Sequence, residues 1–168
     1  MEVFIKILGS YEILTNLIPG VIFYKFSPYS IQNLLQDNNV IILLFTCYFI
    51  GLIINRISSI FLEPLLKKLG VVQYAPYEKF LNAEKKDPDH KIDLLVRVNN
   101  LYRVMLAMVI VLLFVKAFYA IGPVQFSCPI LTFICQNWLF VFLLILFLFS
   151  YRKQTSYIKR RIENLVDK

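Results

Sequence analysis

The tail of the chain holds the residues whose types and spacing most clearly suggest chemistry, namely the binding of an anion. On a helix that turns about 100° per residue, four of its cations cluster on one face and a fifth lies further round. In chain order these residues are Arg152, Lys153, Lys159, Arg160 and Arg161. Such a cluster attracts phosphates, acidic proteins or anionic lipid headgroups. A basic stretch beside a membrane can also serve only topology and lipid contact, and the spacing leaves that alternative open.

An apolar seam runs beside this basic face. Its residues recur at intervals of four, three, four and three positions, and they are Tyr151, Thr155, Ile158, Ile162 and Leu165. Heptad spacing of this kind aligns one side of a helix for contact with a partner helix. We therefore predict that the tail packs on the corresponding helices of sister copies and that the chain is a homo-oligomer.

A second polar group lies where the predicted helices enter the membrane. Arg97 and Asn100 are three positions apart, and Asn99 and Arg103 are four apart, so they occupy two adjacent ridges of one helix. Polar side chains at membrane depth need partners or water, and a ring of them repeated by symmetry could line the mouth of a pore. An ordinary interfacial rim is the alternative. The pore-lining candidates are Glu12, Asn16, Asn55, Arg56, Arg97, Asn99, Asn100 and Arg103.

Catalytic patterns are missing from the sequence. It contains no nucleophile elbow, no Walker loop, no paired-histidine metal motif and no HxE…CxxC pattern. Its single histidine, His90, lies in the polar run KKDPDHK, which is typical of a solvated loop. We therefore predict no enzyme activity, no metal site and no cofactor.

The elements that must position these residues are membrane helices. With 58% hydrophobic residues and a mean hydropathy of +0.65, the chain is too apolar for an ordinary soluble domain. Sixteen of its eighteen Lys and Arg residues fall at the N-terminus, in 56–103 and in 152–168, whereas 26–39 and 122–137 contain none. Basic loops stay in the cytoplasm during insertion. This alternation predicts a multi-pass protein of the bacterial inner membrane, with both termini and the central loop in the cytoplasm.

The predicted fold is an all-α integral membrane protein with four transmembrane helices and a long C-terminal helix that extends into the cytoplasm. The transmembrane domain covers residues 1–150 and the cytoplasmic basic helix covers 151–168. The last helix has about thirty residues at a rise of ~1.5 Å each, so its length of ~45 Å exceeds the thickness of a hydrocarbon core, which is ~30 Å. The spans are expected at about 3–24, 40–56, 104–121 and 138–151, with a cytoplasmic loop at 57–103.

The first segment has two interpretations, because Pro19 and Gly20 interrupt its helical pattern. In the first, it spans the membrane as a kinked helix. In the second, residues 2–18 lie along the inner interface and only the part after Pro19 dips inward. We favour the first, because four spans place both termini on the same side.

The region between the second and third spans should be partly helical. The second helix should continue amphipathically towards Leu69, with a kink or a new first turn at Pro64 and a stop at Gly70. A short helix is expected at about 77–86, and a long helix should begin near Asp93 and enter the third span.

Three motifs together resemble a known group of proteins. They are the Pro-Gly break in the first segment (NLIPG), the amphipathic exit after the second span (NRISSIFLEPLLKKLG) and the basic C-terminal helix (YRKQTSYIKRRIENL). The chain resembles membrane subunits of bacterial anti-phage systems, most of all the membrane effector of the Hailong system and next the membrane subunit of the Kiwa system. The Hailong resemblance implies a tetrameric ion channel that is held shut by single-stranded DNA oligomers from a partner nucleotidyltransferase. It also implies that the five tail cations hold the DNA backbone.

Three classes of function are consistent with these features. The first is a ligand-gated channel effector that depolarises the host membrane. The second is a non-conducting membrane sensor or anchor that docks a cytoplasmic defence partner. The third is a structural or chaperone subunit of a larger membrane complex. Membrane lipid and further copies of the chain are the expected partners, together with the oligonucleotide that the resemblance implies.

Overall fold

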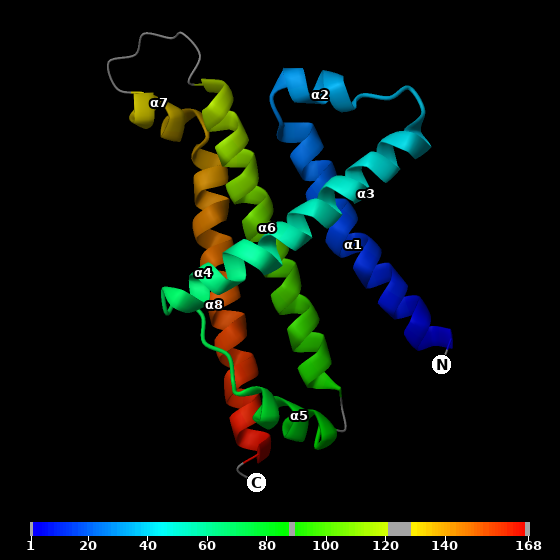
Figure 1. The fold of residues 1–168 in the computed structure, drawn as a ribbon, viewed down its shortest axis with the longest axis vertical. Helices are drawn as coiled ribbons and strands as arrows, with labels where there is room; N and C mark the ends of the chain where they lie inside the picture. Colours follow the sequence, from blue (N-terminus) through cyan, green and yellow to red (C-terminus); the bar gives the residue numbers. More distant parts are fainter. Residues whose placement is uncertain (1, 88–89, 121–128, 167–168) are drawn as a thin grey trace.

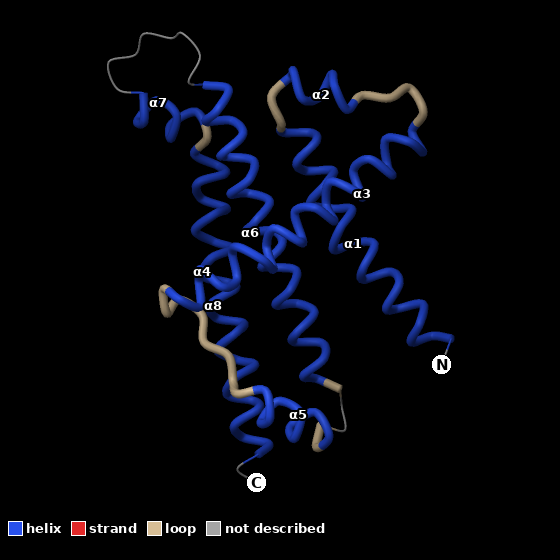
Figure 2. Tube along the Cα trace, viewed as in Figure 1, coloured by secondary structure: helices blue, strands red, loops and turns tan. Residues whose placement is uncertain are grey.

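The computed structural model describes residues 2–87, 90–120 and 129–166, and within these ranges it leaves out the side chains of 2–10, Glu12 and 129–131. All regular structure in the described residues is helical (Figures 1 and 2). The helices are α1 (Glu2–Phe26), α2 (Tyr29–Leu35), α3 (Val40–Ile57), a π-helical turn (Ser58–Leu62), α4 (Glu63–Lys68), α5 (Tyr77–Lys85), α6 (Lys91–Ala120), α7 (Pro129–Gln136) and α8 (Trp138–Val166).

The long helices form two pairs: α6 and α8 run side by side, whereas α1 and α3 cross each other (Figure 1), and α6 contacts both helices of the crossed pair. In Figure 1, α2 and α7 both lie at the upper end, on different sides of it, whereas α5 and the C-terminal end of α8 lie at the lower end. The described parts of the two connections that lack Lys and Arg thus share one end of the molecule. Neither short helix, α2 nor α7, was expected from the sequence.

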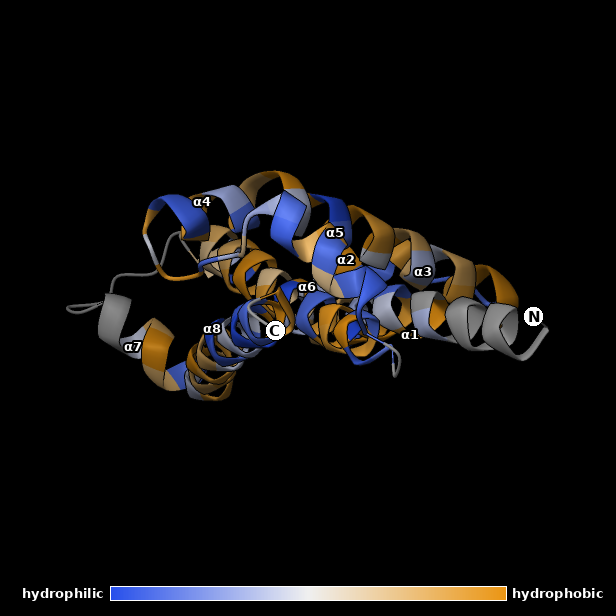
Figure 3. Ribbon diagram, turned by 90° about the horizontal axis from the view of Figure 1, so that it is seen from below, coloured by the Kyte–Doolittle hydropathy of each residue, from blue (hydrophilic) through white to orange (hydrophobic). Residues whose placement is uncertain are grey.

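Three helical stretches are long and apolar enough to cross a membrane. They are Val40–Lys68, which includes α3, the π-helical turn and α4, then Lys91–Ala120 and Trp138–Val166. Ile13–Phe26 is a shorter apolar helix. Large apolar side chains such as Phe45, Phe114 and Phe149 are exposed along these stretches. Figure 3 shows apolar residues along α3 and α8. Such faces suit contact with lipid or with another chain.

The predicted break at Pro19 is absent, because α1 runs unbroken from Glu2 to Phe26 with Pro19 inside it. Pro19 is fully buried, so its packing offsets the backbone hydrogen bond that proline cannot make. The helix is therefore not interrupted at Pro19, and the placement of residues 2–18 across the membrane or along its surface stays a prediction. With 25 residues, α1 is about 37 Å long.

Two glycines bring α1 and α3 into backbone contact. A Cβ atom on Gly51 would lie 1.7 Å from the carbonyl oxygen of Asn16, and one on Gly20 would lie 1.7 Å from that of Cys47. Each helix therefore presents a glycine to the backbone of the other. Small residues allow this close approach between membrane helices.

The chain leaves α3 as the sequence predicts. The helix continues past Ile57, widens into the π-helical turn and re-forms as α4 with Pro64 in its first turn. Gly70 then ends it, with a positive φ of 68° that favours glycine. The expected short helix is present as α5, and α8 begins where the last helix was expected.

The apolar seam of the tail is covered within one chain. Tyr151, Thr155, Ile158 and Ile162 are all buried. Tyr151 belongs to the core that α6 dominates, whereas Ile158 and Ile162 pack with Ala83 of α5 and neighbouring residues of α6. The prediction that these residues pack on sister helices is wrong, because α5 and α6 of the same chain occupy that side of α8.

Candidate anion-binding site

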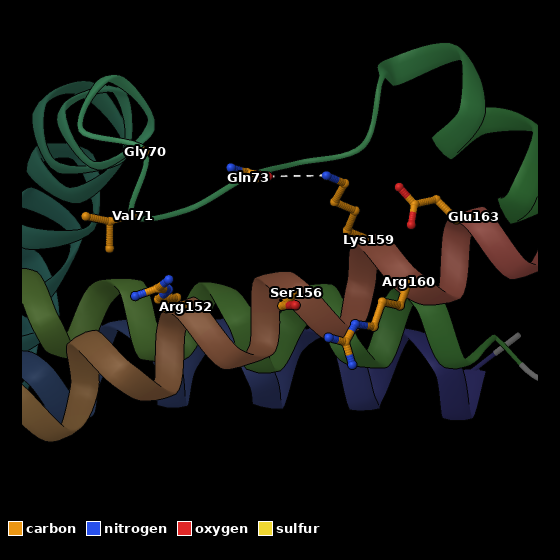
Figure 4. A pocket seen from close by; sticks show the side chains of 8 residues that line it. All are labelled: Gly70, Val71, Gln73, Arg152, Ser156, Lys159, Arg160 and Glu163. Carbon is orange, nitrogen blue, oxygen red and sulfur yellow. Dashed lines mark hydrogen bonds between the residues drawn. The ribbon is translucent and has the colours of Figure 1, made fainter.

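A basic groove lies between α8 and the segment that follows Gly70. The turn at Gly70 directs residues 71–73 alongside α8, so that the two form opposite walls (Figure 4). The groove has a volume of about 290 Å³. Its lining residues are Gly70, Val71, Gln73, Arg152, Ser156, Lys159, Arg160 and Glu163.

The groove carries an excess of positive charge. Three cations and one carboxylate line it, and the carboxylate belongs to Glu163. Lys159 Nζ donates a hydrogen bond to Gln73 Oε1 at 3.3 Å, which draws Lys159 towards the loop wall. Arg152 and Arg160 are exposed, and neither forms an ion pair with any residue that the structure describes. Their guanidinium groups are therefore available to an anion from solution.

The basic surface continues around α8 to Lys153. A shallower hollow of about 440 Å³ is bordered by Arg152, Lys153 and Arg160, so two of the groove cations face both hollows. Lys153 Nζ lies 5.7 Å from the centre of the Tyr157 ring, which is exposed and also borders this hollow. Tyr157 therefore offers an aromatic face beside the cations, whereas Tyr151 is fully buried and offers none.

Arg161 is separated from the other tail cations by its partner. Its Nη2 donates to Asp87 Oδ1 at 2.6 Å, and Asp87 Oδ2 also accepts a hydrogen bond from Ile92 N–H at 2.7 Å. Burial disfavours the charged form of Asp87, but the Ile92 N–H and the Arg161 guanidinium outweigh burial and hold the pKa of Asp87 below its usual range. Arg161 thus ties the start of α6 to α8 and does not belong to the groove.

Two of the pore-lining candidates form a hydrogen bond that joins α1 to α3. Asn55 Nδ2 donates to Asn16 Oδ1 at 2.9 Å, next to the glycine contact between these helices. Arg56, one position further along, is exposed. The side chain of Glu12 lies outside those that the structure describes.

The candidates on α6 are also engaged within the chain. Arg103 forms an ion pair with Glu63 of α4, and Arg97 forms one with Asp93 at 2.9 Å. Asn99 is buried, and its Oδ1 accepts a hydrogen bond from Thr155 Oγ1 at 3.0 Å. The partners lie on α4, α6 and α8, so these contacts hold one chain together. Asn100 lines a cavity between α4, α5, α6 and α8, as Asn99 and Arg103 also do.

Two polar contacts involve residues that the sequence did not single out. Glu63 is the partner of Arg103, and the hydroxyl groups of Tyr74 and Tyr151 are hydrogen-bonded at 2.5 Å. Glu63 directly precedes Pro64, and an acidic residue in a first helical turn was the one local sign of its importance. Nothing near Tyr74 in the sequence points to Tyr151, which is 77 positions away.

The described residues contain no cluster of His, Cys, Asp and Glu that could hold a metal ion. Comparisons with models of protein families, with curated proteins and with solved structures gave no match to this chain. The arrangement of its own residues is therefore what supports a function.

Proposed function

We propose that this protein is a membrane effector of bacterial anti-phage defence whose basic groove binds a polyanion, and that it forms a homo-oligomeric ion channel gated by that ligand. Arg152, Lys159 and Arg160 all line one groove, which supports the ligand-binding part of the proposal (Figure 4). Lys153 extends the same surface. The resemblance to the Hailong effector favours a single-stranded oligonucleotide, a partner nucleotidyltransferase and a tetramer.

The membrane placement follows from the helices and the charge alternation. Three stretches are long enough to span, and α1 supplies a fourth helix of 25 residues. With both termini in the cytoplasm of a cell whose inner membrane holds the spans, the groove on α8 would face the cytoplasm. A cytoplasmic oligonucleotide could then reach it without crossing the bilayer.

A pore in this protein would form between copies. The pairs Asn16–Asn55 and Glu63–Arg103 form inside one chain, so these side chains are already engaged there. The exposed apolar sides of the spanning helices are the surfaces left for contact between copies and with lipid. Arg56 is the exposed polar candidate at the matching depth of α3, and a symmetric assembly could bring its copies to a shared axis.

Binding of a single-stranded oligonucleotide to the purified protein tests the groove. If Arg152, Lys153, Lys159 and Arg160 each neutralise one phosphate, the logarithm of the association constant should fall with the logarithm of salt with a slope of about −2.8. Affinity should then drop roughly 50-fold between 50 and 200 mM salt. Fluorescence anisotropy of a labelled oligonucleotide measures both quantities.

A matched pair of variants assigns the binding to this surface. Arg152→Glu with Arg160→Glu reverses two groove charges and should abolish binding. Lys79→Glu with Lys85→Glu makes the same change of net charge on exposed residues of α5 and should weaken binding only slightly. Equal loss in both variants would show diffuse attraction to a basic protein and would contradict the groove.

A non-conducting sensor or anchor is the second candidate function. The observation in its favour is that most of the pore-lining candidates are paired within one chain. In this case the groove would dock an acidic partner, and the charge-reversed variant would lose that partner without any change in membrane conductance.

A further inference from the structure

A second cavity lies between α4, α5, α6 and α8, and its volume is about 340 Å³. Its polar wall includes Glu63, Lys67, Asn100, Arg103 and Lys159, and most of the remaining wall is aromatic or aliphatic. Of these residues only Lys159 also borders the basic groove. The volume lies in the range of pockets that bind small ligands.

The charges around this cavity are unbalanced. One carboxylate oxygen of Glu63 lies 2.7 Å from Lys67 Nζ, and the other forms the ion pair with Arg103. One negative charge is thus shared by two cations, while Lys159 adds a third cation to the wall. Excess positive charge in a partly enclosed cavity raises the local concentration of anions.

One donor in the wall is unused. Arg103 Nε is buried and has no hydrogen-bond partner among the residues that the structure describes. Buried donors in folded proteins nearly always have an acceptor, so Arg103 keeps unused hydrogen-bonding capacity beside the cavity. A phosphate oxygen is the acceptor that a guanidinium group binds best.

The position of the cavity along the helices indicates which anion it receives. Arg103 directly precedes the expected span 104–121, so with that span in the membrane this end of the cavity would lie at the edge of the hydrocarbon. Tyr74 and Tyr77 belong to the wall, and tyrosine is enriched at the level of lipid headgroups. Basic pockets between membrane helices are suited to anionic headgroups.

We propose that this cavity binds the headgroup phosphate of an anionic phospholipid. Lys67, Arg103 and Lys159 contact the phosphate oxygens, and the aromatic wall packs on the glycerol backbone. The inference rests on the membrane placement proposed above, but it does not depend on the oligonucleotide or on conduction.

Native mass spectrometry of the detergent-purified protein tests the site. With equal amounts of phosphatidylglycerol and phosphatidylcholine, wild-type chains should retain phosphatidylglycerol, because the choline group neutralises the phosphate. Lys67→Gln should weaken this retention roughly tenfold, since a hydrogen bond to a charged group is worth at least one decade of affinity. Lys68→Gln is the matched control, because it removes the same charge from an exposed neighbour outside the cavity.

A second variant and a soluble ligand complete the test. Asn100→Leu fills part of the cavity without breaking an ion pair and should also weaken retention, with thermal unfolding showing that both variants fold. Glycerol 3-phosphate, which lacks acyl chains, should compete only weakly. Equal losses in Lys67→Gln and Lys68→Gln, equal retention of both lipids, or tight binding of glycerol 3-phosphate alone would each overturn the lipid site. Oligonucleotide binding by the same variants reports separately on the groove.

Discussion

The contact between α1 and α3 allows a prediction from geometry alone. Gly51→Ala adds one Cβ atom that would lie 1.7 Å from the carbonyl oxygen of Asn16, so the helices must separate by about 1.7 Å to restore an ordinary contact of 3.4 Å. The neighbouring hydrogen bond from Asn55 to Asn16 is 2.9 Å long and would break at that separation. The smallest possible side chain at position 51 thus disrupts both contacts.

The expected loss of stability is the sum of two penalties and one gain. Overpacking costs about 1–3 kcal/mol, and a lost hydrogen bond between membrane helices costs about 0.6–1.7 kcal/mol. Alanine recovers up to ~1 kcal/mol because it forms helices better than glycine. A net loss of about 2–3 kcal/mol corresponds to a fall in Tm of about 4–12 °C for a chain of this size.

Thermal unfolding of the detergent-purified protein, followed by circular dichroism, measures this shift. Asn55→Ala removes only the hydrogen bond and should lower Tm by less than Gly51→Ala. Phe49→Trp enlarges an exposed side chain of the same helix and should leave Tm unchanged. A Gly51→Ala protein as stable as the wild type would refute the close approach of α1 and α3.

Three further predictions concern topology, the tail and pH. Reporter fusions after Lys86 and at the C-terminus should report a cytoplasmic location, because loops rich in Lys and Arg are retained inside. A fusion near Gln125 should report a location outside the cytoplasm. A cytoplasmic signal at Gln125 would exclude four spans. Ile158→Asp places an unpaired carboxylate in the contact between α5 and α8, which costs several kcal/mol. Limited proteolysis should therefore cut residues 71–87 faster in this variant than in Tyr157→Asp, which changes an exposed neighbour. Equal rates of cleavage would contradict the contact between α5 and α8. Because the pKa of Asp87 is lowered in the folded protein, the ionised carboxylate stabilises the fold fully at pH values above the usual pKa of 3.8, and this stabilisation is lost as the pH falls through the folded pKa. Asp87→Asn should therefore be less stable than the wild type by about 2 kcal/mol at neutral pH and should differ less from it in acid. A difference in unfolding free energy that stays constant between pH 7 and pH 3 would contradict this role.

The sequence predicts the long helices after α1 and the short helices α4 and α5, because their signals are local. Unbroken apolar runs specify α3, α6 and α8, while Pro64 and Gly70 mark the start and the end of α4 through backbone chemistry that acts within one turn. Pro19 misleads because burial against neighbouring helices offsets its cost, and burial depends on the whole fold.

The contacts between helices could not be predicted in the same way. A heptad seam shows that α8 packs on something, but the identity of that partner depends on where α5 and α6 come to lie. The tail sequence does not distinguish Arg161 from the other tail cations. Only the fold brings its partner Asp87, which is 74 positions earlier in the chain, within hydrogen-bond distance. The groove likewise needs Gln73, which the turn at Gly70 places opposite Lys159.

Single-channel recording in planar bilayers, with and without a single-stranded oligonucleotide, tests the central proposal most directly. We expect a current through the purified wild-type protein that the oligonucleotide blocks from the side of the groove. The Arg152→Glu, Arg160→Glu protein should conduct in the presence of the same oligonucleotide. Bilayers that stay silent with and without the oligonucleotide, for both proteins, would contradict the channel and favour the non-conducting anchor.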